Sequence, residues 1–260
     1  MANINNTDVV KGQYKNAGNL NVRISIHEKY STNKQGFGNW IYAQYKIGAS
    51  AKVLELGCGT GSMWADHLEI LSTGAELILT DFSEGMIETA KKNLGEHQGL
   101  SYGTVDIQNI PYEDESFDVV IANMMLYHVP DLQKGLSEVR RVLKPEGTFY
   151  CATYGEHGIM EYIENALAGF GVSSDVSREF TLQSGGAKLA DFFRRVERME
   201  YEDSLAVTDT EDIIEYVYSL SGLTNLESVD RAALREILES RKENGILNIP
   251  KEYGMFLCRK

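Results

Sequence analysis

A glycine-rich loop that follows a short apolar run constrains the fold of this chain more than any other feature. The segment VLELGCGTG occupies residues 53–61 and places Gly57, Gly59 and Gly61 directly after the apolar residues. Glycine has no Cβ atom, so the backbone can turn tightly there and a ligand can approach it closely. In an open α/β sheet such a loop lies at the carboxyl edge of the strands, where ligands bind.

Apolar runs alternate with amphipathic stretches through the first part of the chain. Leu132, Leu136, Val139 and Leu143 follow a 4-3-4 spacing that favours one helical face, and Ser83 is the expected N-cap of another helix. This alternation implies βαβ units, a parallel sheet and right-handed crossovers. Strands are expected at residues 51–57, 76–81, 100–107, 117–124 and 148–154, and helices at residues 35–48, 62–71, 83–94 and 131–143, the last of which KPEG should end.

The alternation is looser after residue 155. We expect helices at residues 157–169, 210–220 and 229–243, and strands at residues 196–207 and 253–259. The late helices indicate a lid or a substrate cap. The predicted organisation is therefore an N-terminal cap segment at residues 1–50, an α/β core at residues 51–155, and residues 156–260 that complete the sheet and carry the helical cap.

Two acidic residues at strand ends accompany the glycine loop. Asp81 ends the second strand, 20 residues beyond Gly61, where a carboxylate can accept hydrogen bonds from ribose hydroxyls. Asp106 lies near the end of the third strand and can accept a bond from an exocyclic amine. Each feature alone also fits a glycine turn without a ligand or a solvated acid, but together they specify an adenosine-shaped site.

Residues 51–155 resemble the class I S-adenosylmethionine-dependent methyltransferases. The resemblance rests on Glu55 to Gly61 as E-x-G-x-G-x-G and on three further segments: TDFSEGMIETAKKN, DIQNIPYEDESFDVVIANMMLYHV and LKPEG. The last two are typical of the small-molecule branch that includes methyltransferases similar to those of quinone biosynthesis. The resemblance implies a doubly wound, mostly parallel, Rossmann-like sheet of seven strands whose last strand is antiparallel. It also implies S-adenosylmethionine as methyl donor and S-adenosylhomocysteine as product.

The same resemblance assigns roles to residues around the loop. Glu55 and Gly61 belong to the binding loop, and Gly57 and Gly59 would pack against the methionine portion of the donor. Asp81 would hold the ribose and Asp106 the adenine amine. The remaining assignments place Phe82 beside the adenine, Ile107 in the same pocket, and Asn123 near the methionine and the sulfonium.

Tyr127 and His128 follow the fourth strand and are the candidate catalytic residues. Methyl transfer is an in-line displacement, so the protein mainly aligns the two substrates and excludes water. A base is needed only where the acceptor must lose a proton, and His128 could serve as one. Alternatively, His128 caps or packs beside the next helix. Tyr30 is expected to close the cofactor pocket, or else to pack the N-terminal segment onto the core.

The composition of the chain limits the classes of partner that it is expected to bind. The net charge of −13 disfavours nucleic acid and anionic lipid surfaces, and no apolar run approaches the ~20 residues that span a bilayer. Three scattered cysteines and the absence of a secretory signal favour a reduced, cytoplasmic protein. The histidines lack metal-ligand spacing, so no metal is expected. The oligomeric state does not follow from the sequence.

A small organic acceptor is the favoured substrate, and three other functions stay open. The acceptor could be a peptide or protein, because an acidic groove could receive a basic segment. A nicotinamide-dependent oxidoreductase shares the fold, but Ser62 replaces the last glycine of its fingerprint. A protein that binds the cofactor without catalysis is the third alternative.

Overall fold

Seven strands form one sheet in the computed structural model, which describes residues 18–170, 179–220 and 229–260. The strand order is β3-β2-β1-β4-β5-β7-β6. The strands are β1 (Lys52–Leu56), β2 (Glu76–Asp81), β3 (Leu100–Thr104), β4 (Phe117–Ile121), β5 (Leu143–Tyr154), β6 (Arg195–Val207) and β7 (Leu247–Arg259).

The strand directions confirm the expected sheet. Strands β1 to β5 pair in parallel, whereas β7 runs antiparallel to both β5 and β6. The chain reverses its order across the sheet at β1, which lies between β2 and β4. The glycine loop follows β1, so it lies at the switch point where open α/β sheets bind ligands.

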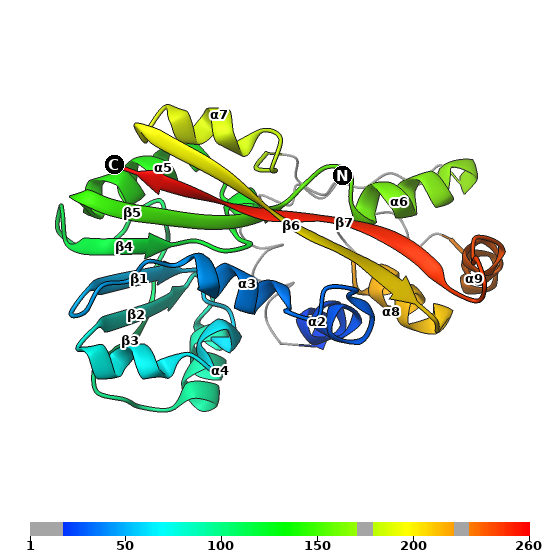
Figure 1. Cartoon of the computed structure of the whole chain (residues 1–260), viewed down its shortest axis with the longest axis horizontal. Helices are drawn as coiled ribbons and strands as arrows, with labels where there is room; N and C mark the ends of the chain where they lie inside the picture. The colour runs from blue at the N-terminus through cyan, green and yellow to red at the C-terminus, as the bar shows by residue number, and fades with distance from the viewer. Residues whose placement is uncertain (1–17, 171–178, 221–228) are drawn as a thin grey trace.

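Helices cover both faces of the sheet and one end of it (Figure 1). Ser83 caps α4 as predicted, because its side chain accepts a hydrogen bond from the Met86 amide. The apolar stripe of α5 is buried through Leu136 and Val139. The helices are α2 (Gly18–Tyr30), α3 (Phe37–Gln44), α4 (Glu84–Leu94), α5 (Leu132–Val142), α6 (Ile159–Ala166), α7 (Gly185–Ala190), α8 (Thr210–Ser219) and α9 (Arg231–Ser240).

The helix predicted at residues 62–71 is wrong. Two 3₁₀ segments, Ser62–Trp64 and Leu68–Thr73, occupy this region instead. The Trp64 indole is fully buried and donates a hydrogen bond to Glu55, which fixes the first turn under the sheet. His67 then leaves helical geometry with φ −132° and stacks on Tyr42 at 3.6 Å between ring centroids.

Other boundaries differ where tertiary packing decides them. Helix α5 ends at Val142, but β5 begins at once with Leu143 rather than after KPEG, and its register shifts between the pairs Phe117–Leu143 and Val119–Thr148. The closing strand β7 begins at Leu247, not at residue 253. Helices α2 and α7 were not predicted, because neither has a regular apolar stripe.

Strands β6 and β7 are 13 residues long and extend well beyond the parallel strands (Figure 1). Their distal halves carry buried Leu205, Val207, Leu247 and Ile249. These residues form a core of their own with Ile26 of α2 and with apolar residues of α6, α8 and α9. Helices from both ends of the sequence are thereby held beside the carboxyl edge of the sheet. Residues 1–17 of the predicted cap segment lie outside the described residues.

Candidate active site

The glycine loop adopts a left-handed backbone that only glycine accepts easily. Gly57, Gly59 and Gly61 have φ values of 73°, 56° and 74°. A Cβ atom on Gly57 would lie 2.8 Å from Met125 Cγ, and one on Gly61 would lie 2.8 Å from Leu94 Cδ1. A Cβ atom on Gly59 would meet nothing within 4 Å. The loop therefore packs tightly at its two ends and is open at Gly59.

Asp81 joins β2 to this loop. One carboxylate oxygen accepts the Gly59 N–H at 2.9 Å and the other accepts the Ser83 N–H at 2.8 Å. Burial raises the pKa of Asp81, and the backbone hydrogen bonds oppose that shift. Each oxygen keeps a further lone pair, so the carboxylate can still accept hydrogen bonds from a ligand's hydroxyls.

A cavity of about 970 Å³ opens beside the loop, large enough for two small molecules side by side. Nine of the residues predicted for the site line it: Gly57, Gly59, Asp81, Phe82, Asp106, Ile107, Asn123, Tyr127 and His128. The opposite wall comes from α2, α6, α8 and β7. The structure thus brings the end of the parallel sheet together with these four elements, called the cap from here on, around one space.

Glu55, Gly61 and Tyr30 do not line the cavity. Glu55 is buried and accepts the Trp64 indole N–H at 2.6 Å, so it supports the loop from below. Burial raises its pKa to about 7. Gly61 faces α4. The Tyr30 hydroxyl donates to Asp212 at 2.6 Å, and its ring packs against the core of the cap. These three residues therefore do not contact the space in which a cofactor would bind.

Asn123 faces the cavity, and the chain itself uses both ends of its side-chain amide. Its Nδ2 donates to the Tyr45 hydroxyl at 2.6 Å, and its Oδ1 accepts the Ala152 N–H at 3.2 Å. These bonds hold the segment after β4 against α3 and β5. Asp106 also lines the cavity, and it accepts the Gln108 backbone N–H at 2.9 Å and that residue's side-chain amide at 3.1 Å.

Tyr127 and His128 lie on a 3₁₀ turn, Leu126–His128, in the loop that follows β4. Their ring centroids are 4.5 Å apart, and Tyr127 packs at 4.6 Å from Tyr154. Burial, followed by the positive charge of Arg23, lowers the pKa of His128 to about 4. His128 is therefore a neutral imidazole at physiological pH, and its lowered pKa makes it a weaker base than an exposed histidine.

Sequence reasoning missed the contribution of β7 to the cavity. Lys251, Glu252 and Tyr253 all line it, but they lie almost 200 residues beyond the glycine loop. The only signal was an aromatic residue at the start of the predicted closing strand. Among the residues that the structure describes, no cluster of three or more His, Cys, Asp or Glu side chains is suited to hold a metal.

Comparisons with known proteins agree with this geometry. Residues 54–151 match the family model described as a methyltransferase domain. The demethylmenaquinone methyltransferase of Clavibacter sepedonicus is 36% identical over 99 residues, which cover 38% of this chain and 39% of that protein. Residues 54–151 are thus similar to a methyltransferase domain, the family that the sequence motifs predicted.

Solved structures extend the likeness in fold. Phosphoethanolamine N-methyltransferase 2 of Haemonchus contortus, in complex with S-adenosyl-L-methionine, superimposes with a TM-score of 0.61 at 17% identity. That match covers 97% of this chain and 59% of the other. The [4+2]-cyclase SpnF gives a TM-score of 0.54 at 16% identity over 86% of this chain and 80% of its own. The chain spans well under two thirds of the length of the first curated relatives that it matches.

The residues present fit the methyl donor of this methyltransferase family. Gly59 leaves open space where any other residue would place a side chain, and the backbone there can lie against a ligand. The buried carboxylate of Asp81 is suited to accept hydrogen bonds from paired hydroxyls. Both features line the same cavity as Phe82 and Ile107, which offer apolar surface for a planar base.

Proposed function

We propose that this protein transfers a methyl group from S-adenosylmethionine to a small organic acceptor and releases S-adenosylhomocysteine. One observation carries the proposal. The glycine loop with Asp81, and the aromatic and polar wall of the cap, face each other across a single cavity of about 970 Å³. A cavity near the upper end of the range for small-molecule sites has room for a donor and a small acceptor together.

Each residue has a defined part in this proposal. Gly57 and Gly59 approach the methionine portion of the donor, Asp81 binds the ribose hydroxyls, and Asp106 binds the adenine amine. Phe82 and Ile107 lie against the adenine. Asn123 fixes the backbone near the methionine through its bonds to Tyr45 and Ala152.

The donor supplies an activated methyl group on a sulfonium, and the chain supplies alignment and exclusion of water. The cap residues of α2, α6 and β7 hold the acceptor against the loop. Where the acceptor has an ionisable proton, the neutral imidazole of His128 accepts it as the new bond to carbon forms. Tyr127 packs beside that imidazole and orients it.

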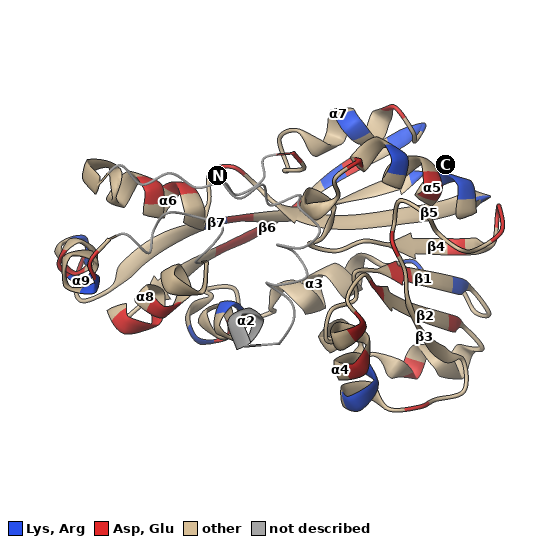
Figure 2. Cartoon of the chain, turned by 180° about the vertical axis from the view of Figure 1, so that it is seen from behind, with Lys and Arg blue, Asp and Glu red and all other residues tan. Residues whose placement is uncertain are grey.

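A small acceptor fits the charge distribution better than a nucleic acid does. Many of the basic residues lie on α5, α7 and near the C-terminal end of the chain (Figure 2). Several are paired with acids there, such as Arg194 with Glu146. The likeness to demethylmenaquinone methyltransferases supports the quinone-biosynthesis-like branch.

The surroundings in which the protein works are part of the same proposal. None of the helices that the structure describes is long and apolar enough to cross a membrane. Cys58, Cys151 and Cys258 are buried free thiols, as suits a protein of the cytoplasm.

The structurally similar protein SpnF is named a cyclase, so methyl transfer has to be measured as well as cofactor binding.

Calorimetric titration with S-adenosylmethionine, S-adenosylhomocysteine and NADH tests the donor assignment. We expect saturable binding of the first two, no binding of NADH, and a loss of about tenfold or more in affinity for Asp81→Asn. Asp114→Asn, which removes an exposed carboxylate outside the cavity, is the matched control. Binding of NADH alone would favour the oxidoreductase.

Transfer of radiolabelled methyl groups to a panel of acceptors tests catalysis. The panel holds hydroxyaromatic compounds, amines, thiols and basic peptides. Methylation of small compounds only is the expected result. Labelled peptides alone would favour a protein substrate, and donor binding without any labelled product would favour a binding protein.

A further inference from the structure

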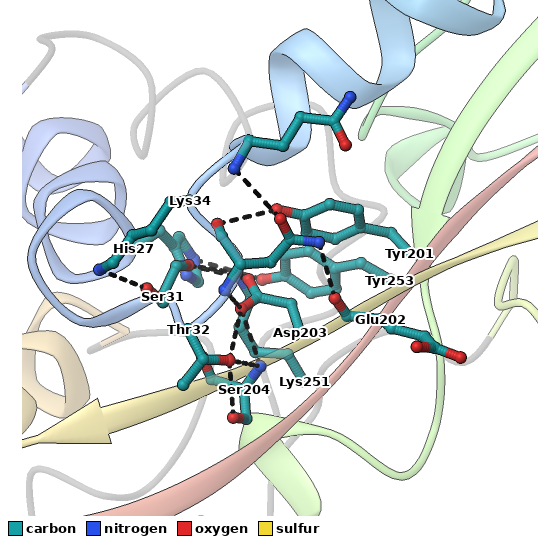
Figure 3. A network of polar contacts seen from close by, with 12 residues as sticks. His27, Ser31, Thr32, Lys34, Tyr201, Glu202, Asp203, Ser204, Lys251 and Tyr253 are labelled. Carbon is teal, nitrogen blue, oxygen red and sulfur yellow. Dashed lines mark hydrogen bonds and ion pairs between the residues drawn. The ribbon is translucent and has the colours of Figure 1, made fainter.

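His27 of α2 and Tyr253 of β7 meet at the wall of the cavity that the cap supplies. His27 Nε2 and the Tyr253 hydroxyl are 3.3 Å apart, and both residues line the cavity. Their ring centroids are 5.6 Å apart, and Tyr216 packs edge-on against His27 at 6.4 Å. Figure 3 shows both side chains within the polar network that joins α2 to β6 and β7.

The described residues use only part of the hydrogen-bonding capacity of the His27 ring. Its Nδ1 atom is buried and has no hydrogen-bond partner among the described residues. Burying a polar atom without a partner is unfavourable, and such atoms are uncommon in folded proteins. The Tyr253 hydroxyl has one donor and two acceptor positions, of which the bond to His27 uses one. The pair therefore has hydrogen-bonding capacity that the described part of the chain does not use.

The pair is uncharged, although charged groups surround it. Burial, and then the positive charge of Lys251, lower the pKa of His27 to about 3, while Asp203 opposes the shift. Burial raises the pKa of Tyr253 well above its usual range. The Lys251 ammonium is already engaged by Asp203 and Ser31. An incoming group thus meets a neutral imidazole and a neutral phenol.

The walls beside the pair are aromatic. Phe37 lies 5.1 Å from Tyr253 between ring centroids. Tyr154 is the cross-strand partner of Tyr253, and it packs against Tyr127, which neighbours His128. A row of aromatic residues, Tyr127, Tyr154 and Tyr253, therefore lines the cavity between the candidate base and the pair. A largely apolar, planar molecule with one polar oxygen would match this row.

We infer that His27 and Tyr253 form a positioning pair that hydrogen-bonds a hydroxyl or carbonyl oxygen of the acceptor. The inference rests on the proposed function, because it places the acceptor in the part of the cavity that the cap lines. The pair fixes the orientation of the acceptor and takes no proton from it. Proton acceptance is left to His128.

The test uses full-length protein saturated with S-adenosylhomocysteine, with 1-naphthol as the probe and naphthalene as the probe without oxygen. Tyr253→Phe and His27→Phe each remove one member of the pair and keep a ring. His27→Gln keeps an amide near the Nε2 position. Tyr102→Phe is the matched control, because its hydroxyl bonds Gly95 outside the cavity. Affinities come from calorimetry, and the ¹⁵N signals of the His27 ring report on its hydrogen bonds.

We expect 1-naphthol to bind the loaded wild-type protein and to shift the His27 ring signals. The two phenylalanine variants should weaken 1-naphthol binding by about 3- to 10-fold, the value of one neutral hydrogen bond. His27→Gln should lose less, and naphthalene and S-adenosylhomocysteine should bind all variants equally. Equal affinity of 1-naphthol for wild type and Tyr253→Phe, or no binding to the loaded wild type, would overturn the inference. Failure of the wild type to bind S-adenosylhomocysteine would instead overturn the proposed function, and this inference with it.

Discussion

The backbone N–H of Gly59 donates a hydrogen bond to the carboxylate of Asp81 at 2.9 Å. This bond connects the loop after β1 to the end of β2 and sets the open side of the loop toward the cavity. The same carboxylate is proposed to bind the donor ribose. In this proposal one side chain both shapes the loop and contacts the ligand.

The contrast between Gly59 and Gly61 separates ligand binding from folding. An alanine at either position must adopt a left-handed backbone, which lowers the stability of the fold by about 1–2 kcal/mol. In Gly59→Ala the new methyl group enters open space at the cavity, so we expect donor affinity to fall about tenfold or more with only that loss of stability. In Gly61→Ala the methyl group collides with Leu94, so we expect a loss of about 2–4 kcal/mol.

Urea unfolding and calorimetry with S-adenosylhomocysteine measure the two effects. Folded Gly61→Ala should keep most of its donor affinity, because Gly61 does not line the cavity. Strong loss of binding in Gly61→Ala together with full binding in Gly59→Ala would contradict the assignment of the loop's open side.

Much of this site follows from the sequence because local spacing fixes it. The loop after β1 and the acids after β2 and β3 reach one sheet edge in any parallel α/β sheet, so Gly59, Asp81 and Asp106 could be placed together. The packing of Glu55 could not be predicted, since it depends on the Trp64 indole folding back against the strand. Tyr253 and His27 are 226 residues apart, and only the length of β7 brings them together.

Buried Glu55 should make stability depend on pH. Its folded-state pKa is raised to about 7 from an ordinary 4.5, so the folded protein binds a proton that the unfolded chain releases. The stabilisation is complete below pH 4.5 and is lost as pH rises through about 7, in total about 3 kcal/mol. Glu55→Gln removes this dependence. Between pH 4.5 and 8, we therefore expect the unfolding free energy of the variant to rise by about that amount relative to that of wild type.

Urea titrations of both proteins at several pH values measure this difference. Glu69→Gln, which removes an exposed carboxylate, should run parallel to wild type. A constant offset between Glu55→Gln and wild type across the range would show that Glu55 is ionised in the folded protein.

His128 should make stability depend on pH in the opposite direction to Glu55. Its folded-state pKa is lowered to about 4 from 6.5, so the unfolded chain binds a proton more readily than the folded protein. The resulting stability is complete above pH 6.5 and is lost as pH falls through about 4, by at most about 3 kcal/mol. The stability of His128→Gln should fall less than that of wild type on acidification. The C2 proton of His128, followed by NMR, should not titrate above pH 5.

The ion pair between Lys251 and Asp203 joins β7 to β6, and both side chains also bond Ser31, which directly follows α2 (Figure 3). The two side chains are 1% and 0% exposed, and Asp203 also accepts bonds from Ser31 and the Asn33 N–H. Lys251→Met leaves a buried carboxylate without its cation, so we expect a loss of about 3–5 kcal/mol. Lys144→Met, which breaks an exposed pair with Asp118, should cost less than about 1 kcal/mol.

A double-mutant cycle with Asp203→Asn isolates the pair. Once the lysine is gone, neutralising the aspartate should be nearly harmless, because an asparagine oxygen can still accept from the Asn33 N–H. We expect a coupling of about 2 kcal/mol or more in urea unfolding. Additive effects of the two substitutions would mean that the pair does not hold α2 against β6 and β7, and that the backbone bond from Thr32 to Ser204 suffices.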